Sequence, residues 1–573
     1  MIEFVKKHWL ALILALILGA LMVLPFFYFE SKLGSNFHGI IPEVVNDELF
    51  YYARIKDVVD GHSLLGNAYL SEHKSILPQQ VFLTEYLLAQ PIKLFNLNTN
   101  TAHLIYNFLF PVIAFILTYL ALYLISKSRF WAIIFSLFLF FGLYLIDFIR
   151  PVSPQFNFIF WLLQFILLWR FLENSRSRKL LFLNIFNFGF LFYVYPYYWT
   201  FYLIFFVVFI TLNFINSKYF HNSNYGSKQI IKIIVGGFIL ATPYFYLNYL
   251  ALKLPEYTET LTRLGLIYSR FPSGIRIALW SLLGLLTFGF AIWRKFIKLG
   301  IKTIFFISGI LASVIAVNQH LITGRNIEFS SHYSMGAIFF LVFAVAYLWS
   351  KRGSTLIQDQ RLSAILLLII VLAVVASSLD GYSKRAFAIN EKNIYIQNYA
   401  AIFEWLNKNT AKDSVVYANP DLSGLVPVYT ANNVYFVREA NLFLVSDAEV
   451  LDRFILNNFF ENIDKDFIIE NVRSIYGVRF IDAYGHTVQG NKLRRLLGIK
   501  PESEIYLPEN AVQKVLSRAK ELQSGNFIRE LNQYRIDYLI WDKNQNPNWQ
   551  IGEDFDPIFN ANNIVIYEIN GRK

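Results

Sequence analysis

The chain of 573 residues contains no cysteine. Disulfide bonds, a thiolate nucleophile and every Cys-bearing metal site are therefore excluded, so that any metal would need oxygen or histidine ligands. Charged residues are scarce as well, at 16% of the chain against about 25% in soluble globular proteins. Apolar and aromatic residues are abundant instead: 55% of the residues are hydrophobic, with 57 Phe and 35 Tyr. This composition is typical of a polytopic membrane protein.

The formal net charge of +11 raises the question of nucleic-acid binding. Lys and Arg, however, gather in short connections between long apolar runs, which is the distribution expected of topology signals. No basic domain is recognisable in the sequence. We therefore expect no nucleic-acid partner.

Long apolar runs predict a mainly α-helical membrane protein. The first run, at 9–29, is long enough to cross a hydrocarbon core of roughly 30 Å, and it lacks the short core and small-residue cleavage site of a signal peptide. The further runs lie near 102–125, 130–148, 156–172, 180–194, 198–215, 230–250, 276–293, 303–318, 334–350 and 362–379. We expect about 11 transmembrane helices within residues 1–382.

The basic residues predict the orientation of these spans. Lys6 and Lys7 precede the first span and place the N-terminus in the cytoplasm, and the basic residues of every second connection agree with this. An odd number of spans leaves the C-terminus outside. We therefore expect an integral, multi-pass protein of the cell (plasma) membrane, in contact with membrane lipids, whose residues 30–101 form a long first outer loop. Residues 47–59 and 79–95, the latter broken at Pro91, have the spacing of helices on a membrane surface.

The composition changes after Asp380, and residues 383–573 predict an extracytoplasmic α/β domain. Its expected helices include 395–406 and 510–522, and a capping box at Ser446 and Glu449 opens another. Its expected strands lie at 415–417, 434–437, 538–541 and 564–569. The domain carries no Gly-rich phosphate loop, metal-ligand spacing or nucleophile elbow.

The strongest candidate for a functional site follows the first span. Residues 46–54 read Asn-Asp-Glu-Leu-Phe-Tyr-Tyr-Ala-Arg and bring together the adjacent carboxylates Asp47 and Glu48, two tyrosines and Arg54. These groups would lie just outside the hydrocarbon, within reach of water and of a lipid head group. The alternative is a helix start at the membrane interface, with carboxylates near the positive helix end and tyrosines in the aromatic belt.

Other polar groups gather at the predicted outer ends of the spans, where ionisable residues are not exposed to the bilayer centre. They include Asp147 with Arg150, the tyrosine-rich turn 193–199, Arg263 and Arg270 in one outer loop, and the stretch 318–333 with Arg325, His332 and Tyr333. Arg150 could merely extend to the interface, and the tyrosines could belong to the aromatic belt. Arg263 and Arg270 oppose the positive-inside bias, so a purely topological role does not explain them.

This set of groups fits the transfer of a sugar from a polyprenyl-phosphate carrier. A carboxylate, here Asp47, takes the proton of the acceptor as it attacks the anomeric carbon, while Glu48 positions the acceptor or raises the pKa of Asp47 by like-charge proximity. Arginine or histidine neutralises the departing phosphate. We expect these cations among Arg54, Arg150, Arg263, Arg270, Arg325 and His332, with Tyr333 beside them.

The order of these features resembles the GT-C fold glycosyltransferases, in particular the protein O-mannosyltransferase and aminoarabinose transferase branch. The likeness consists of the acidic pair Asp47-Glu48 in a long first outer loop, eleven or so spans, the stretch 318–333 and a C-terminal outer domain. The resemblance implies a lipid-linked sugar donor and a glycan, lipid or protein acceptor. No Trp-Trp-Asp signature of oligosaccharyltransferases is found. No cofactor is required, although Asp47 could coordinate a divalent cation.

Three alternatives stay open. A transporter or flippase for lipid-linked sugars would share the outer basic groups, but it should show broken helices or ionisable residues at mid-membrane and internal repeats. A polymerase or ligase of lipid-linked saccharides acts on similar substrates. A non-catalytic membrane protein would bind its partner through the outer domain.

Overall fold

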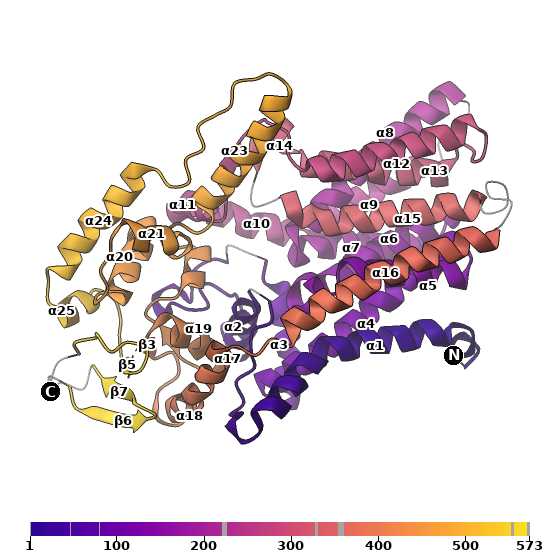
Figure 1. The fold of residues 1–573 in the computed structure, drawn as a ribbon. Coiled ribbons are helices and arrows are strands. Elements are labelled where there is room, and N and C mark those ends of the chain that lie inside the picture. Colours follow the sequence, from indigo (N-terminus) through magenta and orange to yellow (C-terminus); the bar gives the residue numbers. More distant parts are fainter. Residues whose placement is uncertain are drawn as a thin grey trace.

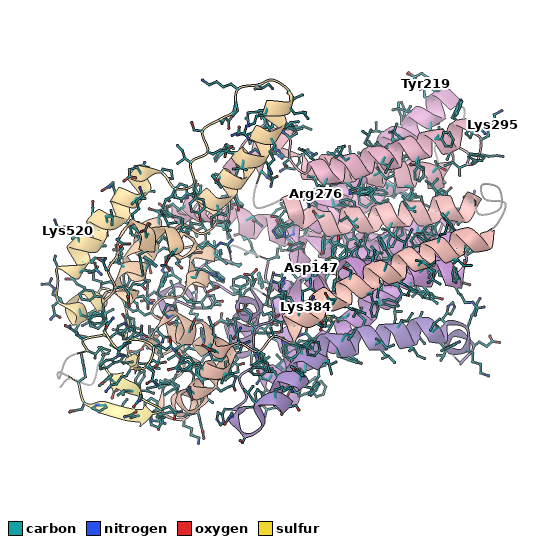
Figure 2. The ribbon with its side chains drawn as sticks, viewed as in Figure 1. Asp147, Tyr219, Arg276, Lys295, Lys384 and Lys520 are labelled. Atoms are coloured by element: carbon teal, nitrogen blue, oxygen red, sulfur yellow. The ribbon has the colours of Figure 1, made fainter. Side chains whose placement is uncertain are left out.

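The computed structural model describes residues 2–45, 47–78, 81–220, 226–326, 330–352, 360–551 and 555–569. The chain forms a bundle of long helices, with the C-terminal α/β domain placed at one end of it (Figure 1). We call this end of the bundle the domain end. Figure 2 adds the side chains and marks two opposite regions, Lys295 at the far end of the bundle and Lys520 on the C-terminal domain.

Helices coincide with the apolar runs that the sequence predicts as spans, except that the run 130–148 leaves the regular helix after Leu137. Within the described residues, seven helices are long and apolar enough to cross a membrane, or eight if the bent pair α9 and α10 is one span, and two further apolar helices are shorter. A mainly helical bundle with several candidate membrane spans is thus confirmed, whereas the number of eleven spans stays a prediction. The bundle helices are α1 (Ile2–Leu33), α4 (Thr99–Ser126), α5 (Arg129–Leu137), α6 (Asn157–Glu173), α7 (Arg178–Val194), α8 (Pro196–Phe220), α9 (Ser227–Leu240), α10 (Thr242–Ala251), α12 (Ile275–Trp293), α13 (Ile301–Val317), α15 (Ser334–Arg352) and α16 (Gln360–Ala386).

Large apolar side chains cover the outside of this bundle. On α16 they include Ile365, Leu366, Ile369 and Ile370, and α12 exposes Leu279, Trp280 and further leucines. Apolar surface of this extent is rare in soluble proteins and is stable only in contact with lipid or with another protein. It is the surface expected of helices embedded in a bilayer.

The chain between α5 and α6 is irregular and turns back into the protein. A π-helical turn (Phe138–Leu143), two short turns and a second π-helical segment (Pro151–Phe156) replace the regular helix. Among membrane-spanning helices, backbone outside a regular helix is tolerated only where its polar groups find partners within the protein. Gln155, for example, is buried and donates to Asn107 Oδ1 at 2.6 Å and to the carbonyl of Phe148. This turn brings Arg150 to the domain end.

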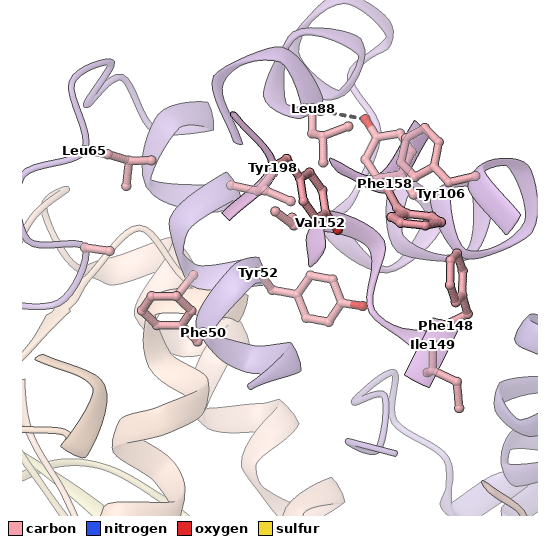
Figure 3. Close-up of a cluster of buried hydrophobic side chains, with 14 of the residues drawn as sticks. Phe50, Tyr52, Leu65, Leu88, Tyr106, Phe148, Ile149, Val152, Phe158 and Tyr198 are labelled. Carbon is pink, nitrogen blue, oxygen red and sulfur yellow. Dashed lines mark hydrogen bonds between the residues drawn. The ribbon is translucent and has the colours of Figure 1, made fainter. Parts of the chain in front are cut away.

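The segment between α1 and α4, residues 34–98, is named the first connecting segment. It forms α2 (Glu48–Val59) and α3 (Leu83–Phe95). The predicted break at Pro91 is wrong, because α3 continues through this residue. Phe50 and Tyr52 of α2 belong to a buried cluster with residues of α4, α6, α8 and the irregular turn, shown in Figure 3. The cluster fixes α2 to the bundle by burial of apolar surface.

The C-terminal domain contains a five-stranded sheet of order β4-β3-β5-β7-β6. β3 (Val415–Tyr417) pairs in parallel with β4 (Asn433–Val434) and β5 (Tyr538–Asp542), and β7 (Ile564–Glu568) pairs antiparallel with β5 and with β6 (Pro557–Ala561). All three residues of β3 are buried, as expected of a central strand between parallel neighbours. Three of the predicted strands, at 415–417, 538–541 and 564–569, are confirmed, whereas the strand predicted at 434–437 is wrong beyond Val434, because β4 ends there.

The helices of the domain are α17 (Glu391–Tyr395), α18 (Ala400–Asn409), α19 (Pro420–Tyr429), α20 (Asp447–Asn457), α21 (Lys465–Glu470), α22 (Val472–Tyr476), α23 (Arg479–Leu496), α24 (Glu509–Gln523) and α25 (Phe527–Leu531). Ser446 accepts from the backbone N–H of Glu449 at the start of α20, which confirms the predicted cap. The domain thus combines one mixed sheet with helices, most of which lie in the chain between β4 and β5.

The first connecting segment also contacts the C-terminal domain. The backbone N–H of Val434 in β4 donates to the carbonyl of Tyr69 at 3.0 Å. Arg453 of α20, which is buried, contacts Glu72 at 3.0 Å and Glu449 at 2.8 Å. The segment is therefore held between the bundle and the domain.

A second junction involves the loop between α10 and α12. Its helix α11 (Glu256–Arg263) ends in Arg263, which is buried and donates to Asp447 at 2.5 Å and to the carbonyls of Asn441 and Val445. Beyond it, β1 (Ile267–Tyr268) pairs antiparallel with β2 (Arg325–Asn326), and α14 (His320–Thr323) precedes β2.

Arg263→Ala should destabilise the junction between bundle and domain. Removing one partner of a buried ion pair costs about 3–5 kcal/mol, because the remaining charge and carbonyls lose their donors. We expect a lower melting temperature of the purified protein in detergent, measured by intrinsic fluorescence. Arg529→Ala is the matched control, because Arg529 is exposed and pairs with its neighbour Glu530. Equal melting of the two variants would contradict a structural role for Arg263.

Candidate active site

A cavity of about 1020 Å³ lies between the domain end of the bundle and the C-terminal domain. Its walls come from α2, Pro78 and residues 81–85, the irregular turn, the start of α8, α10, α11, residues 319–326 and 332–333, and the domain residues 438–482. Six of the residues predicted from the sequence line it: Asp47, Arg54, Arg150, Arg325, His332 and Tyr333. Three others, Glu48, Arg263 and Arg270, do not line this cavity.

Asp47 lies at the start of α2 with its side chain facing the cavity. Its backbone is left-handed, at φ 72° and ψ 6°. For a residue with a Cβ this conformation costs roughly 1 kcal/mol, less for Asp than for most residues. Asp47 Oδ2 accepts from Arg150 Nη1 at 3.2 Å, and the Arg150 guanidinium lies 5.9 Å from the centre of the Tyr51 ring. Residues that are 103 positions apart in the chain thus share one corner of the cavity.

Glu48 points the other way, into the protein. Its side chain is buried and accepts from the backbone N–H groups of Val45 at 2.9 Å and Val44 at 3.4 Å. Burial raises the pKa of this carboxyl from 4.5 to about 8. The left-handed turn at Asp47 separates the two neighbouring carboxyls, so the geometry places Glu48 as a support of the turn and not beside an acceptor.

Arg54 forms part of the cavity wall through an internal ion pair. Its Nε donates to Glu85 at 2.7 Å, and Nη2 donates to the carbonyl of Val81 at 2.8 Å. The side chains of Arg54 and Glu85 are both almost completely buried. The pair joins α2 to α3 and gives this wall a fixed shape.

A cluster of aromatic residues surrounds His332. The Tyr195 hydroxyl lies 2.5 Å from His332 Nδ1, and the Tyr197 ring stacks on the imidazole at 4.6 Å between centres. Tyr333 is hydrogen-bonded to Thr200 at 2.9 Å. The tyrosine-rich turn 193–199 and the stretch 318–333 therefore meet at the cavity, as flat faces and hydroxyls suited to a sugar.

The two arginines of the loop between α10 and α12 have structural partners. Arg263 belongs to the junction described above. Arg270 Nη1 donates to the carbonyls of Leu321 and Ile322, at 3.0 and 2.7 Å, and so holds α14. Arg325 does line the cavity, and its guanidinium lies 5.8 Å from the centre of the Tyr268 ring. Of the three, only Arg325 is placed to meet a ligand there.

The C-terminal domain adds charged residues that the sequence did not single out. Arg438, Glu439, Arg473 and Asp482 line the cavity. Arg438 and Glu439 form an ion pair at 2.5 Å on the short turn that follows β4. These residues belong to no recognisable motif, and they lie more than 380 positions after Asp47 in the chain. Only the folded chain shows that they line the same cavity as Asp47.

The cavity changes character from one side to the other. Away from Asp47 and Arg150 in the chain, α8 and α10 contribute apolar and aromatic side chains to its wall: Trp199, Leu203, Ile204, Tyr244 and Leu247. Such a cavity can hold an amphipathic ligand, with its anionic group at Arg150 and its apolar part against these helices.

The charged corner offers a carboxylate and a guanidinium group side by side. Within the described residues, no group of three or more Asp, Glu or His side chains is arranged to hold a metal ion. No protein-family model and no curated protein matches this chain. Function is therefore inferred from the chemistry of the cavity.

Glu48→Gln should change how stability depends on pH. Between about pH 4.5 and about pH 8 only the folded chain keeps the Glu48 proton, so the free energy of unfolding of the wild type falls as pH rises through this window. Gln does not titrate. The melting temperature of Glu48→Gln relative to wild type should therefore rise between about pH 5 and about pH 9. Glu391→Gln, at an exposed position of α17, serves as the control. A difference between Glu48→Gln and wild type that is constant with pH would show that Glu48 is ionised in the folded protein.

Proposed function

We propose that this protein is an integral-membrane glycosyltransferase that moves a sugar from a polyprenyl-phosphate donor to an acceptor. The observation that carries the proposal is the contact of Asp47 with Arg150, at 3.2 Å, in a cavity that is charged on one side and apolar on the other. One corner then offers a base for the acceptor and a cation for the departing phosphate.

The proposed reaction is a single displacement. The acceptor oxygen attacks the anomeric carbon and forms the new glycosidic bond, while the bond from that carbon to the phosphate oxygen breaks and its electron pair stays on the phosphate. The acceptor proton goes to the Asp47 carboxylate. Because one displacement occurs at one carbon, the configuration at that carbon is inverted.

Cations around the cavity neutralise the phosphate that forms. Arg150 is next to Asp47, and Arg325 and His332 lie on the wall to which residues 319–326 and 332–333 contribute. Planar guanidinium groups donate to two phosphate oxygens at once, which favours arginine at such a position. His332, held by Tyr195 and stacked on Tyr197, has a defined ring orientation for a third contact.

The apolar wall is the proposed place of the prenyl chain. Leu203, Ile204 and Leu247 belong to α8 and α10, whose other faces carry exposed apolar side chains. A lipid tail can therefore leave the cavity between helices that are themselves embedded in the bilayer. With a cytoplasmic N-terminus, the cavity and the C-terminal domain lie on the extracytoplasmic face, where the domain residues 438–482 would contact a glycan, lipid or protein acceptor.

One observation favours a second candidate, a transporter or flippase for lipid-linked sugars. α9 and α10 are bent by 51° at a break next to the cavity, and broken helices are common at transporter binding sites. A transporter would bind the same donor but leave the bond between sugar and phosphate intact. Release of free polyprenyl phosphate therefore separates the two functions.

Asp47→Asn should lower the transfer rate by at least about 100-fold, because a general base contributes a factor of about 10² to 10⁴ to the rate. Asn keeps the shape of the side chain and tolerates the left-handed backbone. The measurement is release of polyprenyl phosphate by purified protein in lipid, with polyprenyl-phosphate sugars as donors.

Asp60→Asn is the matched control for this experiment. Asp60 follows the last residue of the same helix, pairs with Lys56 and does not line the cavity. Release by wild type and Asp60→Asn but not by Asp47→Asn would support the proposed base. Normal release by Asp47→Asn would exclude it, and donor binding without release by any of the three proteins would favour the transporter or a non-catalytic binding protein.

Arg150→Ala should reduce transfer by about 100-fold or more, the effect typical of removing one group that stabilises developing negative charge. Arg150→Lys should retain intermediate activity, because lysine keeps the charge without the planar pair of donors. Arg270→Ala is the matched control, since Arg270 donates to backbone carbonyls outside the cavity. Equal loss in Arg270→Ala and Arg150→Ala, at unchanged melting temperature, would refute the proposed phosphate contact.

A further inference from the structure

The C-terminal end of α23 exposes an unusual amount of apolar surface. Leu496 is 82% exposed, Leu497 60%, Ile499 49% and Ile505 61%. Among the described residues of the C-terminal domain, no other exposed leucine or isoleucine lies at the end of a projecting helix (Figure 1). Four exposed leucine and isoleucine side chains within ten residues indicate a contact surface, because a domain in water normally buries most of them. We call residues 496–505 the α23 tip.

The α23 tip lies at the level where the bundle helices begin. The Arg494 guanidinium, two residues before the tip, lies 4.0 Å from the centre of the Phe271 ring. Phe271 comes three residues before Gly274, the N-cap of the candidate span α12. Figure 1 shows the end of α23 beside α14 and near the start of α12, and Figure 2 marks that start with Arg276. The tip is therefore held next to the boundary of the apolar bundle.

Neighbouring segments of the bundle expose apolar residues at the same boundary. Leu321 and Ile322 of α14 are exposed, and α14 follows directly on α13. Arg270 ties α14 to the loop that carries Phe271, through the carbonyls of both residues. The apolar surface of the tip thus continues that of the bundle instead of standing alone on the water-facing part of the domain.

The charges of the tip fit lipid head groups. Lys492 and Lys500 flank the leucines and are exposed. Arg494 pairs with Glu502 at 2.5 Å and Arg495 with Glu504 at 3.2 Å, so these ion pairs hold the loop against the helix. Apolar side chains flanked by lysines are typical of segments that lie in the interface of a membrane, with the ammonium groups at phosphate level.

We propose that the α23 tip is a membrane anchor, which inserts Leu496, Leu497, Ile499 and Ile505 into the head-group and acyl boundary of the bilayer that holds the bundle. The partner is the lipid surface itself, in the leaflet on the side of the C-terminal domain. The other end of α23 carries Asp482 and follows Val478, both of which line the cavity. The anchor would thus fix one cavity wall relative to the membrane, whatever reaction the cavity catalyses.

The absence of cysteine allows a direct test, because a single introduced cysteine is the only site for a thiol-reactive fluorophore. Leu497→Cys and Ile499→Cys are labelled separately with an environment-sensitive dye. Lys520→Cys is the control, because Lys520 is exposed on α24, away from the bundle (Figure 2). Each labelled protein is placed in nanodiscs of phosphatidylcholine and phosphatidylglycerol, with and without a lipid that carries a nitroxide just below its head group.

We expect the nitroxide lipid to quench the labels at 497 and 499 several-fold more than the label at 520, and aqueous iodide to quench only the label at 520. Iodide quenching of all three labels without quenching by the lipid would overturn the proposal. Shielding of 497 and 499 from both quenchers would overturn it as well, in favour of a protein partner or a second copy of this chain. Unchanged melting of the labelled variants confirms that each reading comes from folded protein.

Discussion

Buried guanidinium groups determine how the two parts of this protein fit together. Arg54, Arg263 and Arg453 are all inaccessible to solvent, and each is surrounded by carboxylates and backbone carbonyls. A buried cation is stable only where such partners are complete, so it tolerates few alternative arrangements. The three residues join α2 to α3, α11 to α20, and α20 to the first connecting segment. The cavity between them keeps its shape although its walls come from distant parts of the chain.

Much of the architecture could be predicted from the sequence because it depends on local patterns. Long apolar runs without charge have few outcomes other than membrane helices, and each of them contains a helix here. The strand at 415–417 and the cap at Ser446 follow from equally local signals. Pro91 shows the limit of such signals: it was expected to end a helix, but α3 is held on both sides of it by packing, with Leu88 and Ile92 buried.

The candidate site was predictable only in part, because its geometry depends on long-range contacts. The pattern of 46–54 indicates a place rich in carboxylates, yet a single left-handed residue sends the side chains of Asp47 and Glu48 in opposite directions. The sequence gives the same signal for an arginine that lines a cavity, as Arg325 does, and for one that donates to backbone carbonyls, as Arg270 does. Arg438 and Arg473 reach the cavity through the packing of a whole domain, which no local pattern records.

β4 is the edge strand of the five-stranded sheet, and the first connecting segment covers part of that edge through Tyr69. Uncovered edge strands pair readily with other chains. The C-terminal domain is therefore not a module that is complete in itself, since a segment from the beginning of the chain finishes its sheet. Recombination that exchanged this domain alone would break that contact. A hybrid of two such proteins would therefore need the two pieces to fit each other along this edge.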